Sequence, residues 1–276
     1  MIESLVESFE DPVVLKGLKQ VGAATAIALV VLAVSSLRGL GLEREMGAAF
    51  VRGFVQVLLM GSVIGLILTL PVYYGGVVLI FMLGGAAWIS KDRAEGFPGV
   101  LRVASVSVTV GATTVILTMT AVGAIEPRIR DLVPVGSMVI ANSMKTNSLA
   151  LDRLKDEIES NRERIEAGLS LGAAPSRVVS RHVETGVRAS LIPVIDSLKS
   201  LGWVWIPGIM TGMIISGTNP VYAAEYQFVI MAMIFAGGGL TSMTSSLLVT
   251  RYAFTDAEQL RSFDRNQNQN QENQEE

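Results

Sequence analysis

The side chains that most often carry catalysis or hold metals are scarce in this sequence. It contains no cysteine and a single histidine, His182. Disulfides and thiolate chemistry are therefore excluded, and too few soft ligands remain for a tight zinc or copper site. The sequence also lacks the phosphate-binding pattern GxxxxGK[ST] and the zinc-protease pattern HExxH. We expect no enzyme active site in this chain, no ATP hydrolysis by P-loop chemistry, and no cofactor or metal bound by the chain itself.

Polar side chains and methionines inside apolar stretches are the remaining candidates for chemistry. Asp196 and Lys199 share a helical face, and could either pair with each other or form a charged gate. Asn142 could hydrogen-bond a neighbouring helix or offer an oxygen ligand to a passing cation. Methionines could be packing residues or soft-metal ligands. The candidates for a transport path are Asn142, Met144, Asp196, Lys199, Pro207, Gly208, Met210, Gly212, Tyr226 and Gln227.

Long charge-free stretches must position these residues. The chain is 50% hydrophobic and 17% charged, whereas an average soluble domain is about one quarter charged. A membrane-spanning helix needs roughly 17–25 mostly apolar residues, and the Pro/Gly turn PVYYGG divides the longest stretch into two spans. We therefore predict an all-α polytopic membrane protein, one permease domain over residues 1–263. Its seven predicted spans are approximately 20–37, 54–70, 75–90, 103–125, 132–151, 201–217 and 227–250, the fifth being the weakest because it contains Lys145.

The distribution of basic residues predicts the orientation of the spans. If the C-terminus is cytoplasmic, 18 of the 22 lysines and arginines fall on the cytoplasmic side. Short cytoplasmic loops carry an excess of basic residues. We predict a multi-pass protein of the plasma or inner membrane, with its N-terminus outside and its C-terminus inside. The acidic start, MIESLVESFED, lacks the positive region of a cleaved signal peptide.

The residues between the fifth and sixth spans predict two helices joined by a short turn. Apolar residues recur at helical spacing after Leu151, opposite a face made of charged residues. Gly172 can stop this helix and Pro175 can start the next. We expect this segment, residues 152–199, to project into the cytoplasm. Its small-residue tip (residues 166–175) could dock another protein or could be a structural turn.

Glycines and a proline predict where the spans pack or break. GSVIG (61–65) and GIMTG (208–212) have the small-residue spacing that lets helices approach closely. Pro207 should kink the sixth span, and the glycines at 237–239 should weaken the seventh. Such breaks could flank a substrate path or be irregularities supported by neighbouring helices.

Several segments resemble a family of transporters. EAG and a later glycine at 166–172 resemble the EAA loop with which permeases of ATP-binding-cassette (ABC) transporters dock an ATPase subunit. VPVGSMVIANSM (133–144), VRASLIPVIDSLKSLG (187–202) and IPGIMTGMIISGTNPVYAAEYQ (206–227) resemble the FetB-type permeases, which are related to plant aluminium-tolerance permeases. The similarity covers roughly residues 38–254. It departs from the family at Gly168, which replaces an alanine, and at Gly85, where an asparagine is expected.

This resemblance implies a seven-span permease that exports iron or another metal. It implies that two copies of the permease form a homodimer in the lipid bilayer and bind no nucleic acid. Two separate ATPase subunits would complete the transporter and would bind the ATP and magnesium. The residues that it assigns to ATPase docking are Glu166, Ala167, Gly168, Leu169, Gly172, Ala173 and Pro175.

Two other functions remain open from the residues. A secondary transporter would need no ATPase, and a membrane anchor would relay ATPase motion without transport. The polar tail, residues 264–276, is too poor in apolar residues to form a core, and we expect it to be disordered.

Overall fold

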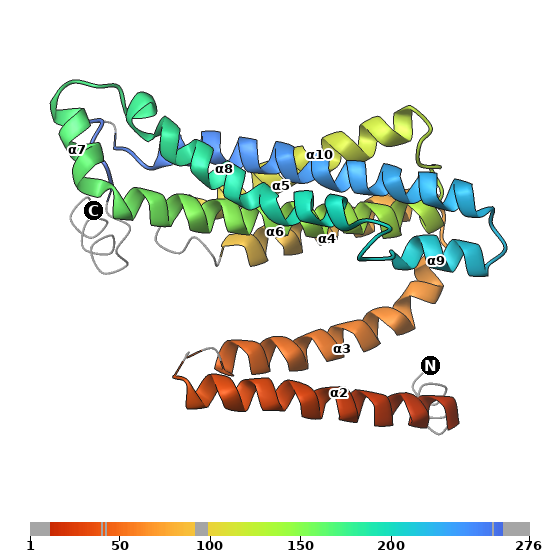
Figure 1. The fold of residues 1–276 in the computed structure, drawn as a ribbon. Helices are drawn as coiled ribbons and strands as arrows, with labels where there is room; N and C mark the ends of the chain where they lie inside the picture. Colours follow the sequence, from red (N-terminus) through yellow and green to blue (C-terminus); the bar gives the residue numbers. More distant parts are fainter. Residues whose placement is uncertain (1–11, 40, 42, 92–98, 256, 262–276) are drawn as a thin grey trace. The chain divides into compact units, whose positions relative to one another are not determined.

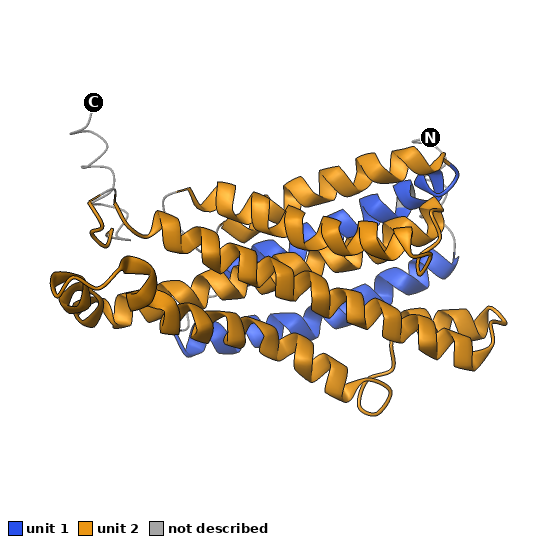
Figure 2. Cartoon of the chain, turned by 90° about the horizontal axis from the view of Figure 1, so that it is seen from above, with its two compact units in different colours: residues 1–69 blue, residues 70–276 orange. Residues whose placement is uncertain are grey.

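The computed structural model describes residues 12–39, 41, 43–91, 99–255 and 257–261. These residues form α-helices, joined by turns and accompanied by two isolated β-bridges (Figure 1). The predicted all-α membrane fold is therefore confirmed. The predicted disorder of residues 264–276 lies outside the described residues. The chain divides into two compact units, residues 1–69 and 70–276, which are coloured separately in Figure 2.

Unit 1 is a pair of long apolar helices. α2 spans Pro12–Leu37 and α3 spans Glu43–Ile67. The turn between them uses Gly39 and Gly41, whose φ angles of 64° and 70° lie in the left-handed region that favours glycine. The hydroxyl of Ser35 donates to Glu43 across this turn at 3.1 Å. Each helix is long and apolar enough to cross a membrane, as predicted for the first two spans.

Unit 2 is a helical bundle built around its last helix. α4 spans Val72–Lys91, α5 spans Val100–Ala121, α6 spans Ile129–Ser160 and α10 spans Pro220–Tyr252. α10 packs against α5, α6 and α8 (Pro175–Ser200). Asn219 caps α10 by accepting from the N–H groups of Val221 and Tyr222 at 2.9 and 3.4 Å. The apolar core of the bundle includes Val108, Ala112, Val139, Ile230 and Met233, all fully buried.

Three helices of unit 2, α4, α5 and α10, are long and apolar enough to span a membrane. They coincide with the third, fourth and seventh predicted spans. The fifth predicted span, 132–151, is the first part of α6. This helix continues without a break into the charged residues up to Ser160.

The sixth predicted span differs from the structure. No single helix covers residues 201–217; α8 runs unbroken from Pro175 to Ser200, residues 201–207 form turns, and the short helix α9 spans Gly208–Ile215. Pro207 does not kink a helix but precedes the first residue of α9. The proline ring removes one backbone donor, so it is tolerated where a helix begins.

Of the two possibilities for the glycines at 237–239, the structure agrees with support by a neighbouring helix. α10 is continuous through Gly237–Gly239, because Gly237 and Gly238 lie where α6 packs closely on α10. A Cβ atom at Gly237 would lie 2.8 Å from Val139, and one at Gly238 would lie 2.9 Å from the Thr146 hydroxyl. By contrast, Cβ atoms at Gly61, Gly65, Gly208 and Gly212 would meet no atom within 4 Å among the described residues.

Candidate docking tip and membrane cavity

A helix stop shapes the tip as the sequence predicted. α7 spans Arg162–Ser170, and Gly172 then adopts φ +81°. The N–H of Gly172 donates to Leu169 at 2.9 Å, and that of Ala173 donates to Gly168 at 3.1 Å. These bonds satisfy the last carbonyls of α7. Pro175 is the first residue of α8, so the predicted turn between two helices is confirmed, but the helix before the turn is interrupted at Asn161, between α6 and α7.

The outer surface of the tip is open, whereas its inner surface is packed. Leu171 is 89% exposed at the turn. Ile165 is fully buried, in a core cluster that includes Val179 and Leu260. A Cβ atom at Gly168 would lie 3.3 Å from both methyl groups of Val178, a tight approach. The glycine that departs from the EAA pattern therefore lets α7 lie close to α8.

Residues 168–172 read Gly-Leu-Ser-Leu-Gly and so fit the GxSxG pattern of α/β-hydrolases. In those enzymes the serine sits on a sharp turn between a strand and a helix. Here Ser170 is the last residue of α7, and its hydroxyl donates to the carbonyl of Glu166 at 2.9 Å. His182 contacts Glu157 at 3.1 Å, which links α8 to α6. The pattern in this chain lacks the elbow geometry of a nucleophile.

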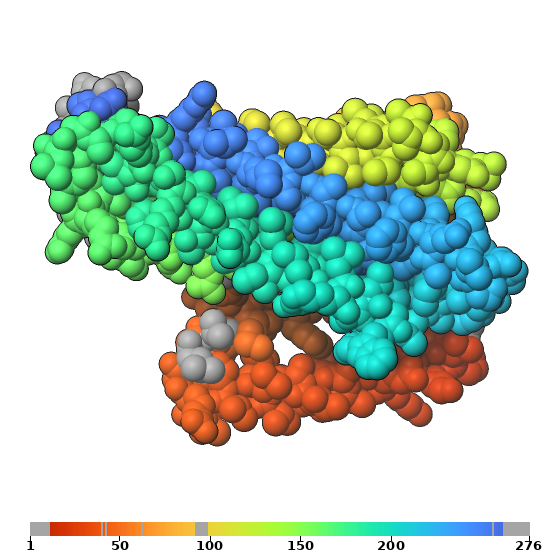
Figure 3. Space-filling view, turned by 45° about the horizontal axis from the view of Figure 1, so that its top comes forward, coloured from red at the N-terminus to blue at the C-terminus, as the bar shows by residue number. Residues whose placement is uncertain are grey.

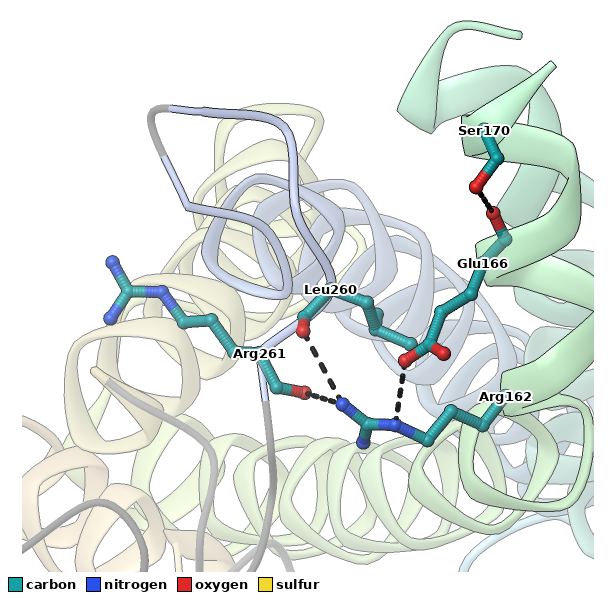
Figure 4. A network of polar contacts seen from close by, with 5 residues as sticks. All are labelled: Arg162, Glu166, Ser170, Leu260 and Arg261. Carbon is teal, nitrogen blue, oxygen red and sulfur yellow. Dashed lines mark hydrogen bonds and ion pairs between the residues drawn. The ribbon is translucent and has the colours of Figure 1, made fainter. Parts of the chain in front are cut away.

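A polar network joins α7 to the segment that follows α10 (Figure 4). Arg162 donates to the Glu166 carboxylate at 2.9 Å through Nε. Through Nη2 it also reaches the carbonyls of Leu260 and Arg261, both at 3.4 Å. These contacts are not evident from the sequence because the partners lie 98 and 99 residues apart.

The segment after α10 folds back on itself as a terminal hairpin (residues 253–255 and 257–261). Phe254 and Leu260 form an antiparallel bridge. The N–H of Thr255 donates to Gln259 at 2.9 Å, and that of Arg261 donates to Ala253 at 2.9 Å. A groove of about 570 Å³ lies between this hairpin and the tip. Its lining residues are Glu166, Leu169, Ser170, Gly172, Ala173, Ala257, Glu258, Gln259 and Leu260.

A second hollow lies within the bundle, between α6, α8, the 201–207 segment and α10. This membrane cavity has a volume of about 390 Å³. Its lining is mixed, with hydroxyl groups, one amide and one ammonium among apolar side chains. The lining residues are Asn142, Lys145, Thr146, Leu149, Ser190, Pro193, Val194, Ser197, Trp205, Met231 and Ile234. Of the predicted path residues, the membrane cavity includes Asn142.

The other predicted path residues are dispersed. Met144 lines a neighbouring hollow of about 380 Å³ with Lys145 and Asp152. Asp196 and Lys199 are exposed and contact each other at 3.5 Å, as one of the two readings predicted. Pro207, Gly208, Met210 and Gly212 lie at or in α9, while Tyr226 and Gln227 lie near the start of α10. The described residues contain no group of three or more His, Cys, Asp or Glu side chains able to hold a metal ion.

The charged residues Asp196 and Lys199 of α8 are on the surface of the bundle, level with the middle of α10. Ser190 and Ser242 share a hydrogen bond of 2.8 Å, which sets the level of α8 against α10. The two helices run in opposite directions and lie side by side in Figure 1 and in the space-filling view of Figure 3. Asp196 and Lys199 therefore lie roughly 9 and 14 Å farther toward the start of α10, at about 1.5 Å per residue. This level falls inside the charge-free stretch Tyr226–Thr250.

Comparison with known proteins identifies one family of membrane proteins. Residues 18–254 match the uncharacterised protein family UPF0014. The UPF0014 membrane protein STAR2 of Oryza sativa subsp. japonica is 31% identical, over 89% of this chain and 87% of that protein. The protein ALUMINUM SENSITIVE 3 of Arabidopsis thaliana is 31% identical, over 90% and 91%. The probable iron export permease protein FetB of Escherichia coli is 28% identical, over 86% and 93%. No solved structure matches this chain.

Proposed function

The chain belongs to the UPF0014 family of membrane proteins, and from that premise we propose that it is the membrane-spanning permease subunit of an ABC transporter. A separate ATPase subunit docks at the tip and supplies the energy. The transported substrate is iron or another metal; the name of the Escherichia coli relative, probable iron export permease protein, gives iron for that protein. The membrane is the plasma or inner membrane, with the tip on the cytoplasmic side.

The tip carries this proposal. It lies beyond the bundle, at the level of the end of α10, since Ile165 packs in one cluster with Val249 and Phe254. An exposed leucine on a turn of small residues contributes nothing to the packing of the bundle, so a contact with another protein is a better explanation for it. Leu171 and the small residues around Gly172 form a surface that the backbone of another protein can approach closely.

α6 and α8, which adjoin the tip, can transmit a movement of the tip to the membrane cavity. α6 has 32 residues, a rod of roughly 48 Å. It runs without interruption from Asn142 at the membrane cavity to Ser160 beside α7. When two ATPase subunits close on ATP, a rigid-body movement of the tips would reach the cavity along α6 and α8.

The exposed charges of α8 support a homodimer. Asp196 and Lys199 have side chains that are 62% and 73% exposed, at a depth where lipid would surround a single bundle. A charged side chain facing hydrocarbon costs about 2.5–3.5 kcal/mol on insertion scales. A second copy, with a water-filled path between the two, removes this cost. Mass photometry of the assembled complex should then give two permeases and two ATPases.

Co-purification of the ATPase tests the proposal. The wild-type chain, solubilised in detergent, should capture a protein that mass spectrometry identifies as a P-loop ATPase and that hydrolyses ATP. Leu171→Asp places a charge on the exposed apolar turn, where it disturbs no packed atom. It should reduce capture at least tenfold. Thr185→Asp, on an exposed part of α8, is the matched control and should capture as wild type does.

The alternatives give different results. A secondary transporter would capture no ATPase and would move metal in response to an ion gradient alone. A membrane anchor would capture the ATPase, yet proteoliposomes containing the complex would show no metal flux with ATP. Either result would overturn the proposal.

A further inference from the structure

We propose that the terminal hairpin is the second wall of the ATPase-docking site, so that the ATPase binds in the groove between the tip and the hairpin. This inference rests on the proposed function and adds a contact surface that the EAA-like pattern does not contain. The groove, about 570 Å³ in volume, takes Glu166, Leu169 and Ser170 from α7. It takes Glu258 and Gln259 from the hairpin.

The tip and the terminal hairpin, the two walls of the groove, are held together by a shared apolar cluster and by hydrogen bonds. Leu260 is buried and packs in the same apolar cluster as Ile165. Beside this contact, Arg162 binds the Glu166 carboxylate and two hairpin carbonyls at once (Figure 4). A guanidinium has several donors in a fixed plane, so it can hold both walls in one arrangement. The groove is therefore built into the fold, and a partner that contacts the tip meets the hairpin as well.

The charges that line the groove indicate the chemistry of the partner surface. Glu166 and Glu258 bring carboxylates, and no lysine or arginine is among the described lining residues. Glu166 is already bound to Arg162, whereas the side chain of Glu258 is exposed. The rest of the lining is mixed, with Leu169 and Ala173 beside the polar side chains of Ser170 and Gln259. The ATPase should therefore present a basic side chain on a surface that is polar as well as apolar.

The position of the hairpin connects a partner bound in the groove to α10 as well as to the helices of the tip. The tip connects α6 to α8, and the hairpin directly follows α10. α10 packs against α5, α6 and α8. A partner held between the two walls would thus move the central helix of the bundle together with the two helices behind the tip.

Site-specific labelling tests the proposal without relying on variants that alter folding. The chain has no cysteine, so Gln259→Cys provides a single thiol in the groove. After purification this thiol is modified with a bulky maleimide. The labelled protein should capture the ATPase at least tenfold less than the same protein before labelling. Thr185→Cys with the same label is the control and should capture normally.

Charge changes provide a second measurement. Glu258→Lys should reduce capture more than Glu258→Gln, and the difference should shrink as the salt concentration rises. Normal capture by labelled Gln259→Cys would overturn the proposal, as would equal capture by the two Glu258 variants. If wild type captures no ATPase, or Leu171→Asp captures it normally, then the proposed function fails first. If Gln259→Cys reacts with the maleimide only after residues 262–276 have been removed, the tail occupies the groove and this inference is wrong.

Discussion

At the scale of single residues, two asparagines on α6 have different surroundings and hence different expected roles. The Asn147 amide donates to the hydroxyl of Ser90 on α4, and both residues are fully buried. The Asn142 amide donates to the carbonyl of Met138 in its own helix at 2.9 Å. Asn142 also lines the membrane cavity. Asn147 therefore joins two helices, while Asn142 bonds within its own helix and lies in the wall of the membrane cavity.

Replacing each asparagine by alanine should separate stability from transport. Asn147→Ala should lower the free energy of unfolding by about 1 kcal/mol, because hydrogen bonds between membrane helices contribute about 0.6–2 kcal/mol. Asn142→Ala should leave the melting temperature unchanged and lower ATP-driven metal flux several-fold. Thermal unfolding in detergent and flux in proteoliposomes measure the two effects. If Asn142→Ala transports metal at the wild-type rate, the membrane cavity is not part of the path.

At the scale of helices, a glycine determines how closely α5 and α10 approach. A Cβ atom at Gly111 would lie 2.7 Å from the carbonyl oxygen of Gly237 and 2.7 Å from the backbone nitrogen of Thr241. Real Cβ atoms do not come so close to backbone atoms, so the two helices would have to separate. Small residues at such crossings let membrane helices pack by van der Waals contact.

Gly111→Ala should therefore destabilise the bundle although alanine favours helices. Overpacking costs typically 1–3 kcal/mol, which exceeds the gain of up to about 1 kcal/mol from helix propensity. The matched control is Gly239→Ala in α10, where the new methyl group meets no atom within 4 Å. Thermal unfolding should show a melting temperature lower by several degrees for Gly111→Ala alone. Equal melting temperatures for the two variants would mean that α5 and α10 are not in tight contact.

At the scale of the whole molecule, the orientation in the membrane decides which partner can reach the tip. α9 and the tip lie at opposite ends of unit 2 (Figure 1). The proposed docking requires the tip to face the cytoplasm, since ATP and the ATPase are there. The excess of basic residues near the same end agrees with this orientation.

Single cysteines can establish the orientation because the chain has none of its own. Ser216→Cys lies just after α9, and Ser170→Cys lies in the tip; both positions are exposed. A maleimide that cannot cross membranes should label Ser216→Cys in intact cells and Ser170→Cys only after lysis. The opposite pattern would place the tip outside and exclude docking of a cytoplasmic ATPase.

The sequence by itself determined the features that depend on local composition. Apolar stretches such as Tyr226–Thr250 indicated membrane helices, because each satisfies its own backbone hydrogen bonds and needs only apolar side chains. Gly172 and Pro175 indicated the turn of the tip, because each restricts its own backbone. The resemblance of residues 38–254 to FetB-type permeases correctly indicated the family.

The tertiary structure alone decided the features that depend on contacts between distant residues. The small-residue spacing indicated Gly61 and Gly212 rather than Gly111, and only the arrangement of α5, α6 and α10 makes Gly111 and Gly237 packing positions. In place of the helix predicted over 201–217, α8 ends at Ser200 and the short α9 packs against α10. The groove required Arg162 to meet Leu260, 98 residues away. Such pairs leave no periodic pattern in the sequence, since a pattern records which face of a helix is apolar but not which helix covers it.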